Sequence, residues 1–401
     1  MIRPAADPRR WLLDPQIDFL NHGSFGACLR SVIAVQDQWR QRMERQPVQF
    51  FVRELETLLD HARAALARFV GARSDDLVFV PNATAGVNTV LRSLRFRRGD
   101  ELLVTNHEYN ACRNALDFVA ETSGAKVVTA PIPFPLRDAG QAFAALANRV
   151  TRRTRLLLID HITSPTGLVL PLEQWIPWLT QRGVEVLVDG AHAPGMIPLR
   201  LGRLGAAYYA GNCHKWLGAP KGAAFLWVHP NHQSRIRPLA ISHGANSPRS
   251  DRSRFQIEFG WTGTSDPSAW LTVPEALRQM AALLPGGWPA IRRRNRRLAL
   301  AAQAILARTL GVEPPAPPAM VGSLAALPLP DAPDAAPPRS PLYADPLQDR
   351  LLQRARIEVP ILPWPAPPRR LLRISAQLYN HSGQYQRLAE ALGNLGIRGL
   401  Q

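Results

Sequence analysis

Residues 184–192 read VEVLVDGAH, a short apolar run that ends in an aspartate and small residues. A run of this length and composition is typical of a strand buried on both faces of a parallel sheet. In open α/β sheets, ligands bind beyond the carboxyl ends of the strands. The run therefore predicts an α/β fold with Asp189 at a ligand site, although an aspartate here also suits the cap of a following helix.

Lysine is scarce in this chain of 401 residues, because only Lys126, Lys215 and Lys221 are lysines among 48 lysine and arginine residues. Lys215 lies in the glycine-bracketed segment 211–218, GNCHKWLG, directly after the apolar residues 206–210. Burial lowers the pKa of an amine and frees its lone pair to form a Schiff base. We therefore predict a reactive amine at Lys215, with an exposed lysine in a turn as the alternative.

A strand-end aspartate and a reactive lysine are the two groups that pyridoxal phosphate most needs from a protein. Asp189 would pair with the ring nitrogen, Lys215 would carry the aldehyde, and His192 could hydrogen-bond the ring hydroxyl. The pair therefore predicts pyridoxal phosphate as the cofactor.

A phosphate cradle is predicted at residues 77–88, LVFVPNATAGVN, where an apolar strand leads into the start of a helix. Free N–H groups and the positive end of the helix dipole attract a dianion there, and the Thr84 hydroxyl adds a donor. His214 is a second candidate contact. The same pattern also suits an ordinary strand-to-helix turn.

Seven stretches, spread over nearly the whole chain, carry a resemblance to a known family: 19–26 (FLNHGSFG), 82–84 (NAT), 105–109 (TNHEY), 188–192 (VDGAH), 211–216 (GNCHKW), 261–266 (WTGTSD) and 373–380 (RISAQLYN). On these motifs the chain resembles fold-type I pyridoxal phosphate enzymes of the class V aminotransferase superfamily, and within it the isopenicillin N epimerase-like group. The resemblance implies a mostly parallel sheet flanked by helices, with a smaller α+β domain at the C-terminus.

The resemblance also assigns roles to single residues. Lys215 would form the internal aldimine, with Asp189 at the ring nitrogen and His192 at the ring oxygen. Thr84, Ala85, His214 and Asn212 would hold the phosphate. Tyr109 would stack on the ring, with His107 as second choice, and Ser164 stands where relatives often have asparagine beside the cofactor. Arg373 would clamp the substrate carboxylate, Asn21 and Ser24 would close over the substrate, and Thr264 would reach the phosphate in a neighbouring subunit of a homodimer with shared active sites.

The expected organisation has three parts. Residues 1–29 form an N-terminal segment that joins the small domain, residues 30–270 the large cofactor-binding domain, and residues 271–401 the small domain. Apolar residues at helical spacing predict helices between about 30 and 70. The proline-rich stretches 314–318 and 331–341 are expected to be surface connections.

A net charge of +17 and a pI of about 11.1 raise the rival hypothesis of a nucleic-acid-binding protein. The densest cluster, residues 292–297 (RRRNRR), lacks interleaved aromatic residues, so we expect it to solvate a helix face. No apolar run approaches the roughly 20 residues that cross a bilayer. The start of the chain does not resemble a secretory signal, so a cytoplasmic location is expected.

The cysteines separate possible reactions. Cys28, Cys112 and Cys213 show no metal-ligand spacing, so no metal is expected, and no cysteine follows position 213. Persulfide-forming desulfurases of this family carry a cysteine on a mobile loop in the C-terminal half, so that activity is disfavoured. Epimerisation, with Tyr109 or His107 as the second acid, is favoured by the resemblance. β-Elimination from a cysteine conjugate or sulfoxide by a C–S lyase, and transamination, stay open.

Overall fold

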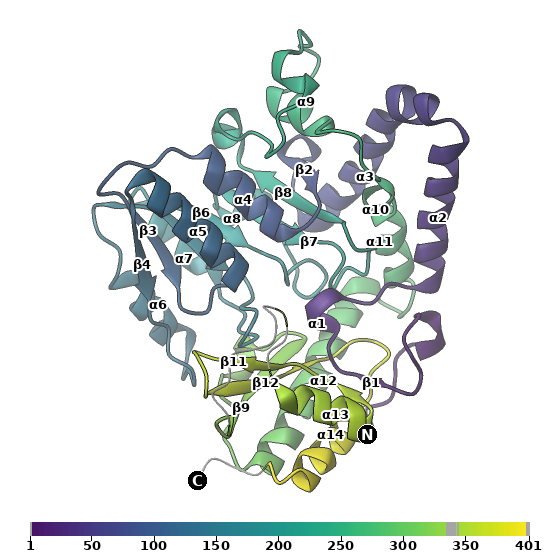
Figure 1. The fold of residues 1–401 in the computed structure, drawn as a ribbon, viewed down its shortest axis with the longest axis vertical. Helices are drawn as coiled ribbons and strands as arrows, with labels where there is room; N and C mark the ends of the chain where they lie inside the picture. Colours follow the sequence, from purple (N-terminus) through teal and green to yellow (C-terminus); the bar gives the residue numbers. More distant parts are fainter. Residues whose placement is uncertain (1, 334–341, 343–344, 398–401) are drawn as a thin grey trace.

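The computed structural model describes residues 2–333, 342 and 345–397, and its large domain is built on a seven-stranded sheet in the order β2-β8-β7-β6-β5-β3-β4 (Figure 1). The strands are β2 (Leu77–Val80), β3 (Glu101–Thr105), β4 (Lys126–Ala130), β5 (Thr154–Asp160), β6 (Glu185–Asp189), β7 (Tyr208–Asn212) and β8 (Ala224–Val228). Strands β3 to β7 run parallel, while β8 is antiparallel to both β7 and β2. The predicted mostly parallel α/β fold is confirmed.

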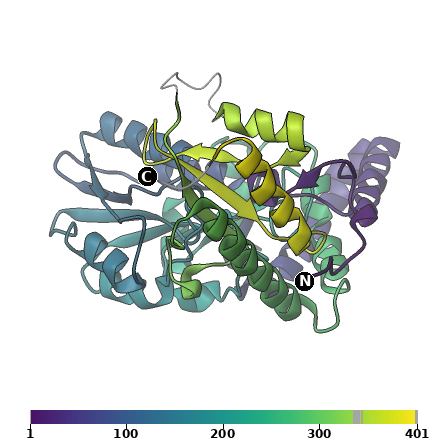
Figure 2. The same ribbon diagram turned by 90° about the horizontal axis from the view of Figure 1, so that it is seen from below.

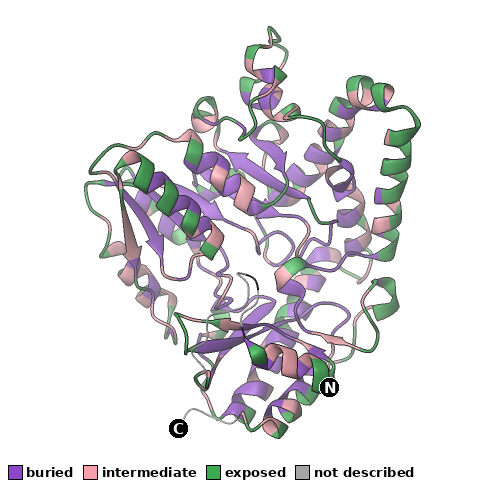
Figure 3. Ribbon diagram, viewed as in Figure 1, coloured by how far each residue is buried: buried purple, intermediate pink, exposed green. Residues whose placement is uncertain are grey.

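Both faces of this sheet are covered. On β6, Val186 and Val188 pack into the core on one face, whereas Leu187 packs into the core on the other. This double burial explains why the strand reads as a continuous apolar run. In Figure 3 the central strands are mostly buried, whereas the edge strand β4 is only partly buried. The helices of this domain are α2 (Arg30–Arg45), α3 (Leu55–Val70), α4 (Ala83–Ser93), α5 (Asn110–Ser123), α6 (Ala139–Ala147), α7 (Leu172–Thr180), α8 (Leu201–Leu204), α9 (Arg254–Gly260), α10 (Ser268–Leu271) and α11 (Val273–Ala281).

The small domain pairs a three-stranded antiparallel sheet with three helices (Figure 2). Its elements are α12 (Gly287–Leu310), β9 (Leu324–Leu329), α13 (Pro346–Ala355), β10 (Ile357–Glu358), β11 (Ile361–Pro363), β12 (Arg370–Ser375) and α14 (Ser382–Asn394). The N-terminal β1 (Asp18–Phe19) pairs with β10, and Leu20 enters the core of this domain. The short helix α1 (His22–Phe25) then lies between the two domains (Figure 1).

Helix α12 passes from one domain core to the other. Its residues Trp288 and Ile291 pack into the core of the large domain, as do α10 and α11, whereas Leu298 and the following apolar residues pack into the small domain. The second proline-rich stretch lies mostly outside the described residues. Within the described ranges, no helix is both long and apolar enough to span a membrane.

The arginine cluster on α12 forms the expected solvated face only in part: Arg293, Arg296 and Arg297 are exposed, whereas Arg292 and Arg294 are not. Arg294 is buried and donates to the Gln377 carbonyl at 2.6 Å and the Arg3 carbonyl at 2.9 Å. The Arg292 guanidinium lies over the Phe69 ring, 5.3 Å from its centroid. The expectation is wrong for these two residues, because carbonyl groups and aromatic rings of neighbouring segments take the place of water.

Candidate active site

The carboxyl ends of β5 and β6 and the turn after β7 meet at one edge of the large sheet, facing the small domain (Figure 1). Asp189 ends β6 and is buried. Lys215 follows β7 in a turn before β8. The structure therefore brings the two residues that the sequence singled out to the same edge of the sheet, where parallel α/β folds bind ligands.

Hydrogen bonds orient the Asp189 carboxylate. The Ala191 N–H donates to Oδ1 at 2.9 Å, and the Cys112 thiol donates to Oδ2 at 3.1 Å. Burial raises the pKa of the Cys112 thiol well above its usual range, so the thiol keeps its proton and remains a donor. Burial also raises the pKa of Asp189, but these two donors and Lys215 oppose that shift. The two donors and the lysine therefore stabilise the ionised form of Asp189 against the cost of its burial.

The contact between His192 and Lys215 indicates the protonation state of the lysine. The Trp216 indole N–H donates to His192 Nδ1 at 3.3 Å, so in the neutral ring the proton sits on Nε2. His192 Nε2 lies 3.2 Å from Lys215 Nζ. Because burial holds the pKa of His192 well below its usual value, the ring is neutral and donates to the amine. That geometry requires a lone pair on Lys215.

The pKa of Lys215 agrees with this requirement. Burial, reinforced by the positive charge of Arg373, lowers the pKa of the amine from 10.5 to about 8. Asp189 acts in the opposite direction, but its effect is smaller than that of burial. A substantial fraction of the amine is therefore neutral at physiological pH, as a nucleophile or general base requires.

The start of α4 forms an anion cradle. Asn82 caps the helix by accepting from the Ala85 N–H at 2.8 Å, and Asn212 Oδ1 accepts from the Ala83 N–H at 2.8 Å. Within the described part of the chain, the Thr84 N–H and hydroxyl meet no internal acceptor. Thr84 therefore has free donors for an anion. The Ala85 N–H is used by the helix cap, and the Asn212 side chain holds the turn through the Ala83 N–H.

His214 lies next to this turn, and its Nδ1 is 3.1 Å from the Ala223 carbonyl oxygen. Burial lowers the pKa of His214 to about 4. In the neutral ring the proton sits on Nδ1, so Nε2 is an acceptor. Donation to a phosphate therefore requires the imidazolium form, which a neighbouring dianion stabilises.

A second charged group, Arg373 on β12, faces the same region from the small domain. It is only 3% exposed, and it donates to the Ser164 carbonyl at 2.6 Å and to the Ser24 hydroxyl at 3.0 Å. Its Nε is buried without an acceptor, and no carboxylate among the described residues forms an ion pair with it. Burial lowers the pKa of Arg373 only to about 10, so this guanidinium is a buried cation without an anion.

The residues around Arg373 form a small polar network. Ser24 donates to Asn21 Oδ1 at 2.5 Å, and the Asn21 side-chain amide donates to Glu358 Oε1 at 3.1 Å. The structure therefore brings Asn21, Ser24 and Ser164 together around one guanidinium, with Ser24 and Ser164 bonded to it directly. A buried unpaired cation with a planar fork is suited to a carboxylate ligand.

The two candidate aromatic residues lie in different places. Tyr109 caps α5 and is 39% exposed; burial of its hydroxyl, with smaller effects of Cys112 and Asp189, raises its pKa. His107 is fully buried, with Nδ1 2.8 Å from the Thr166 hydroxyl and Nε2 3.0 Å from the Ile132 carbonyl. Both ring nitrogens of His107 are therefore occupied, which leaves Tyr109 as the accessible group.

Thr264 lies apart from these residues, exposed in the turn between α9 and α10.

The N-terminal segment approaches the lysine turn closely at Gly26. This glycine has a φ of +71°, and a Cβ built there would lie 2.0 Å from the His214 carbonyl oxygen. The close approach holds α1, and with it Ser24, against the turn that carries Lys215. His22 adds to this contact, because its Nε2 is 3.1 Å from the Lys215 carbonyl oxygen.

We expect Gly26→Ala to lower the free energy of unfolding by about 3 kcal/mol or more, because the added methyl group meets backbone atoms that have no room to move. Gly99→Ala is the matched control, since its φ is +93° and nothing lies within 4 Å of its added Cβ. Backbone strain alone costs about 1–2 kcal/mol there. Urea unfolding of both variants measures the difference, and equal losses would contradict the close approach.

A model of the family described as aminotransferase class-V matches residues 30–319. Isopenicillin N epimerase from Streptomyces clavuligerus is 36% identical over 398 residues, covering 96% of each protein. The chain belongs to the class V aminotransferase family.

Another relative and two solved structures that resemble the chain have different names. A probable chloroplastic L-cysteine desulfhydrase from Arabidopsis thaliana is 31% identical over 405 residues, which cover 95% of this chain and 83% of the relative. Among solved structures, the cystine C–S lyase C-DES with its product cysteine persulfide has a TM-score of 0.76 at 23% identity, covering 95% of this chain and 98% of C-DES. A C-DES mutant with glycine covalently linked to its PLP cofactor has the same TM-score at 22% identity, covering 95% of this chain and 97% of the mutant chain. The fold is thus fold-type I, as predicted.

The residues of this class V chain fit pyridoxal phosphate. A buried carboxylate, a neutral amine and free donors at a helix start match the ring nitrogen, the aldehyde and the phosphate. The unsatisfied Nε of Arg373 adds a place for a substrate carboxylate.

Sequence reasoning missed several residues of this site. Cys112 was considered only as a metal ligand, and Glu108 only as part of a motif. Asp160 ends the apolar run of β5 in the same way that Asp189 ends β6, and the two are register partners. The repeated pattern, an apolar strand that ends in aspartate, could have identified Asp160.

Proposed function

We propose that this chain is a pyridoxal phosphate enzyme that inverts the configuration at Cα of an amino acid or of an amino-acid-derived substrate, as an isopenicillin N epimerase-like epimerase. The observation that carries the proposal is that one site holds both a lysine with a neutral amine, Lys215, and a buried arginine without an anion, Arg373. The first suits proton removal and the second suits a substrate carboxylate.

The roles of the residues follow from this pairing. Pyridoxal phosphate supplies an electron sink for negative charge at Cα. Asp189 holds a positive charge at the ring nitrogen, and Arg373 binds the α-carboxylate so that Cα is held near Lys215. With cofactor and substrate bound, the neutral Lys215 amine would take the Cα proton. Tyr109, which keeps its phenol proton at neutral pH, returns a proton to Cα from the other side.

The epimerase reaction is favoured by the identity with isopenicillin N epimerase along almost the whole chain. A C–S lyase is the second candidate, supported by the L-cysteine desulfhydrase relative and by the likeness to C-DES. A lyase needs one base and a leaving group on Cβ, so Tyr109 would then be dispensable. Transamination, the third possibility, needs Lys215 to move the proton to the cofactor carbon.

Incubation with amino acids in heavy water, followed by chiral and mass analysis, separates the three reactions. Deuterium in an inverted amino acid supports the epimerase, pyruvate supports the lyase, and a keto acid with pyridoxamine phosphate supports transamination. Failure to take up pyridoxal phosphate at all would overturn the enzyme proposal.

For the epimerase, we expect Tyr109→Phe to lower the rate of inversion by about 10²-fold or more, since general acid catalysis contributes that much. Exchange of the Cα proton for deuterium without inversion should persist, because Lys215 is unchanged. Tyr208→Phe, remote from the lysine turn on β7, is the control for loss of a phenol. Equal losses of exchange and inversion in Tyr109→Phe would argue against a second acid at Tyr109.

The lowered pKa of Lys215 predicts how uptake of the cofactor depends on pH. The neutral amine is the reactive form, so the rate should rise with pH and level off above about 8. An ordinary lysine would make the rate rise until about pH 10. Mixing apo-protein with pyridoxal phosphate at different pH values and following absorbance measures the profile; a rate still climbing at about pH 10 would contradict a depressed pKa.

We further propose a homodimer in which Thr264 of one subunit contacts the phosphate held by the other. The exposure of Thr264 in a single chain supports this proposal. Light scattering of the purified protein tests it, and a monomer that retains full activity would contradict it.

A further inference from the structure

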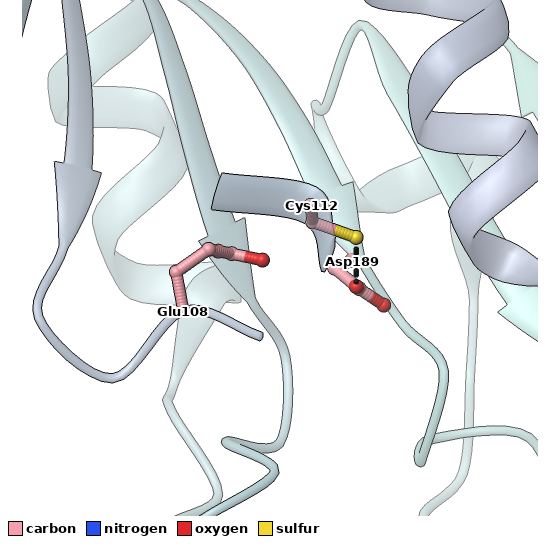
Figure 4. Close-up of side chains that lie close together, drawn as sticks. All are labelled: Glu108, Cys112 and Asp189. Carbon is pink, nitrogen blue, oxygen red and sulfur yellow. Dashed lines mark hydrogen bonds between the residues drawn. The ribbon is translucent and has the colours of Figure 1, made fainter. Parts of the chain in front are cut away.

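Two further carboxyl groups lie beside Asp189. Asp160 ends β5 as the register partner of Asp189, and paired residues on adjacent strands direct their side chains to the same face. Glu108 lies in the turn after β3, with its carboxyl directed towards Cys112 and Asp189 (Figure 4). The nearest ligand atoms of Glu108, Cys112 and Asp189 all lie within 4.8 Å of one another.

Donors are distributed unevenly among the three carboxyl groups. Asp189 accepts a hydrogen bond on each oxygen. Both oxygens of Glu108 and the Oδ2 of Asp160 are shielded from solvent and meet no donor among the described residues. An ionised carboxylate in such a place is costly, whereas a carboxyl group that donates its own proton to a neighbouring carboxylate is not.

The electrostatics point the same way. Burial, then the charges of Asp160 and Asp189, raises the pKa of Glu108 well above its usual range. Burial and Asp189 also raise the pKa of Asp160, but the neighbouring Glu108 carboxyl, as a proton donor, and the charge of Lys215 oppose that shift. Because both oxygens of Glu108 are buried without a donor, but only one oxygen of Asp160 is, Glu108 is the group that keeps a proton and Asp160 is the acceptor. Like-charged carboxyl pairs that share a proton follow the same physics.

The titratable groups that act on this pair come from several elements: Asp189 on β6, Cys112 at the start of α5 and Lys215 after β7. Cys112 has a raised pKa and is uncharged at neutral pH. Lys215 and Asp189 are therefore the charged neighbours that act on the pair.

We propose that Glu108 and Asp160 share a single proton, carried on Glu108, and that this proton lets Asp189 stay ionised beside the cofactor's ring nitrogen. Glu108 is then a positioning residue that acts through Asp160 and Asp189. If the pair lost its proton, three negative charges would meet in one buried space, and Asp189 would become a competing site for the next proton. The link to the ring nitrogen rests on the proposed function, whereas the shared proton itself does not.

Infrared difference spectroscopy of the apo-protein tests the shared proton directly. We expect the carbonyl stretch of a protonated carboxylic acid at neutral pH in the wild type, and its loss in Glu108→Gln. Because no cofactor is present, this result is independent of the proposed enzyme activity. A wild-type spectrum without the band would overturn the proposal. So would a stoichiometric divalent cation in the purified protein, because a metal at Glu108, Cys112 and Asp189 needs the carboxyl groups ionised.

Cofactor affinity tests the link to Asp189. The Glu108→Gln amide still donates to Asp160, so pyridoxal phosphate should bind within about threefold of the wild type at neutral pH. Glu108→Ala removes the donor, so the affinity should fall by about tenfold or more, the equivalent of one pKa unit at Asp189. The wild-type affinity should also decline at alkaline pH as the pair loses its proton, and Glu108→Gln should lack this decline.

The two Glu108 variants also separate the proposal from a purely structural role. Equal losses of affinity in Glu108→Gln and Glu108→Ala, with both variants folded by circular dichroism, would overturn it. If the variants fail to fold, the wild-type infrared band still tests the shared proton, and the wild-type pH profile of cofactor affinity still tests its link to Asp189. A wild type that shows the band but takes up no cofactor would overturn the proposed function and the link to Asp189 together, and would leave the shared proton standing.

Discussion

Replacing Lys215 with alanine is expected to lower turnover by about 10⁴-fold or more, because one side chain serves as both nucleophile and general base. The visible absorption of the bound cofactor should disappear at the same time. Steady-state rates and absorbance spectra of the wild type and Lys215→Ala measure both effects. The depressed pKa of Lys215, together with its contact to His192, is the physical reason for assigning both tasks to this residue.

The small number of lysines makes this prediction sharp. Only Lys126 and Lys221 compete for the cofactor. Lys126 is exposed at the start of β4, so Lys126→Ala is the control and should keep the absorption and the activity. Borohydride reduction followed by peptide mapping should find the cofactor on Lys215. A label on either of the other lysines would refute the assignment.

Arg373→Leu should have opposite effects on activity and stability. Loss of the clamp should lower kcat/KM by about 30- to 5000-fold, the equivalent of about 2–5 kcal/mol for a truncated buried charge pair. In the apo-protein, however, Arg373 is a buried cation without an anion, so replacing it with an apolar side chain of similar size should raise the free energy of unfolding by about 1 kcal/mol or more. Steady-state kinetics and urea unfolding measure the two effects.

Arg370 on the same strand is the matched control. It is buried like Arg373, but it pairs with Asp345, with 2.9 Å between its Nη1 and each carboxylate oxygen. Arg370→Leu leaves this aspartate buried and unpaired, so it should lower the free energy of unfolding by about 3–5 kcal/mol. If Arg373→Leu destabilised the chain as much as Arg370→Leu, this result would contradict the claim that Arg373 lacks an anionic partner in the apo-protein.

Much of the fold could be predicted from short patterns. The apolar run before Asp189 indicates a strand buried on both faces, and in the structure it lies at the centre of a mostly parallel sheet. The helices between about 30 and 70 follow from apolar spacing, and α2 and α3 lie there in the structure. The spacing of apolar residues predicts these elements correctly because a helix or strand that is buried on one or two faces has its own characteristic spacing.

Other features could not be predicted in this way. The arginines of α12 read as a solvated face, yet Arg294 is buried by carbonyl groups of residues far along the chain. Tyr109 was the first choice for the cofactor ring and His107 the second, but the sequence could not show that His107 is fully buried and that Tyr109 is accessible. Partners that arrive from distant segments leave no local pattern.

The sequence by itself determined the candidates for reactive chemistry in this protein: a lysine among very few, a strand-end aspartate, and a family pattern that runs the length of the chain. Only the tertiary structure decided their protonation states and their charged partners. Trp216 sets the tautomer of His192, burial sets the pKa of Lys215, and the missing anion beside Arg373 becomes visible only when the small domain lies against the large one. The physical reason is that side-chain chemistry is local, whereas protonation and charge pairing depend on the dielectric and the partners that distant segments provide.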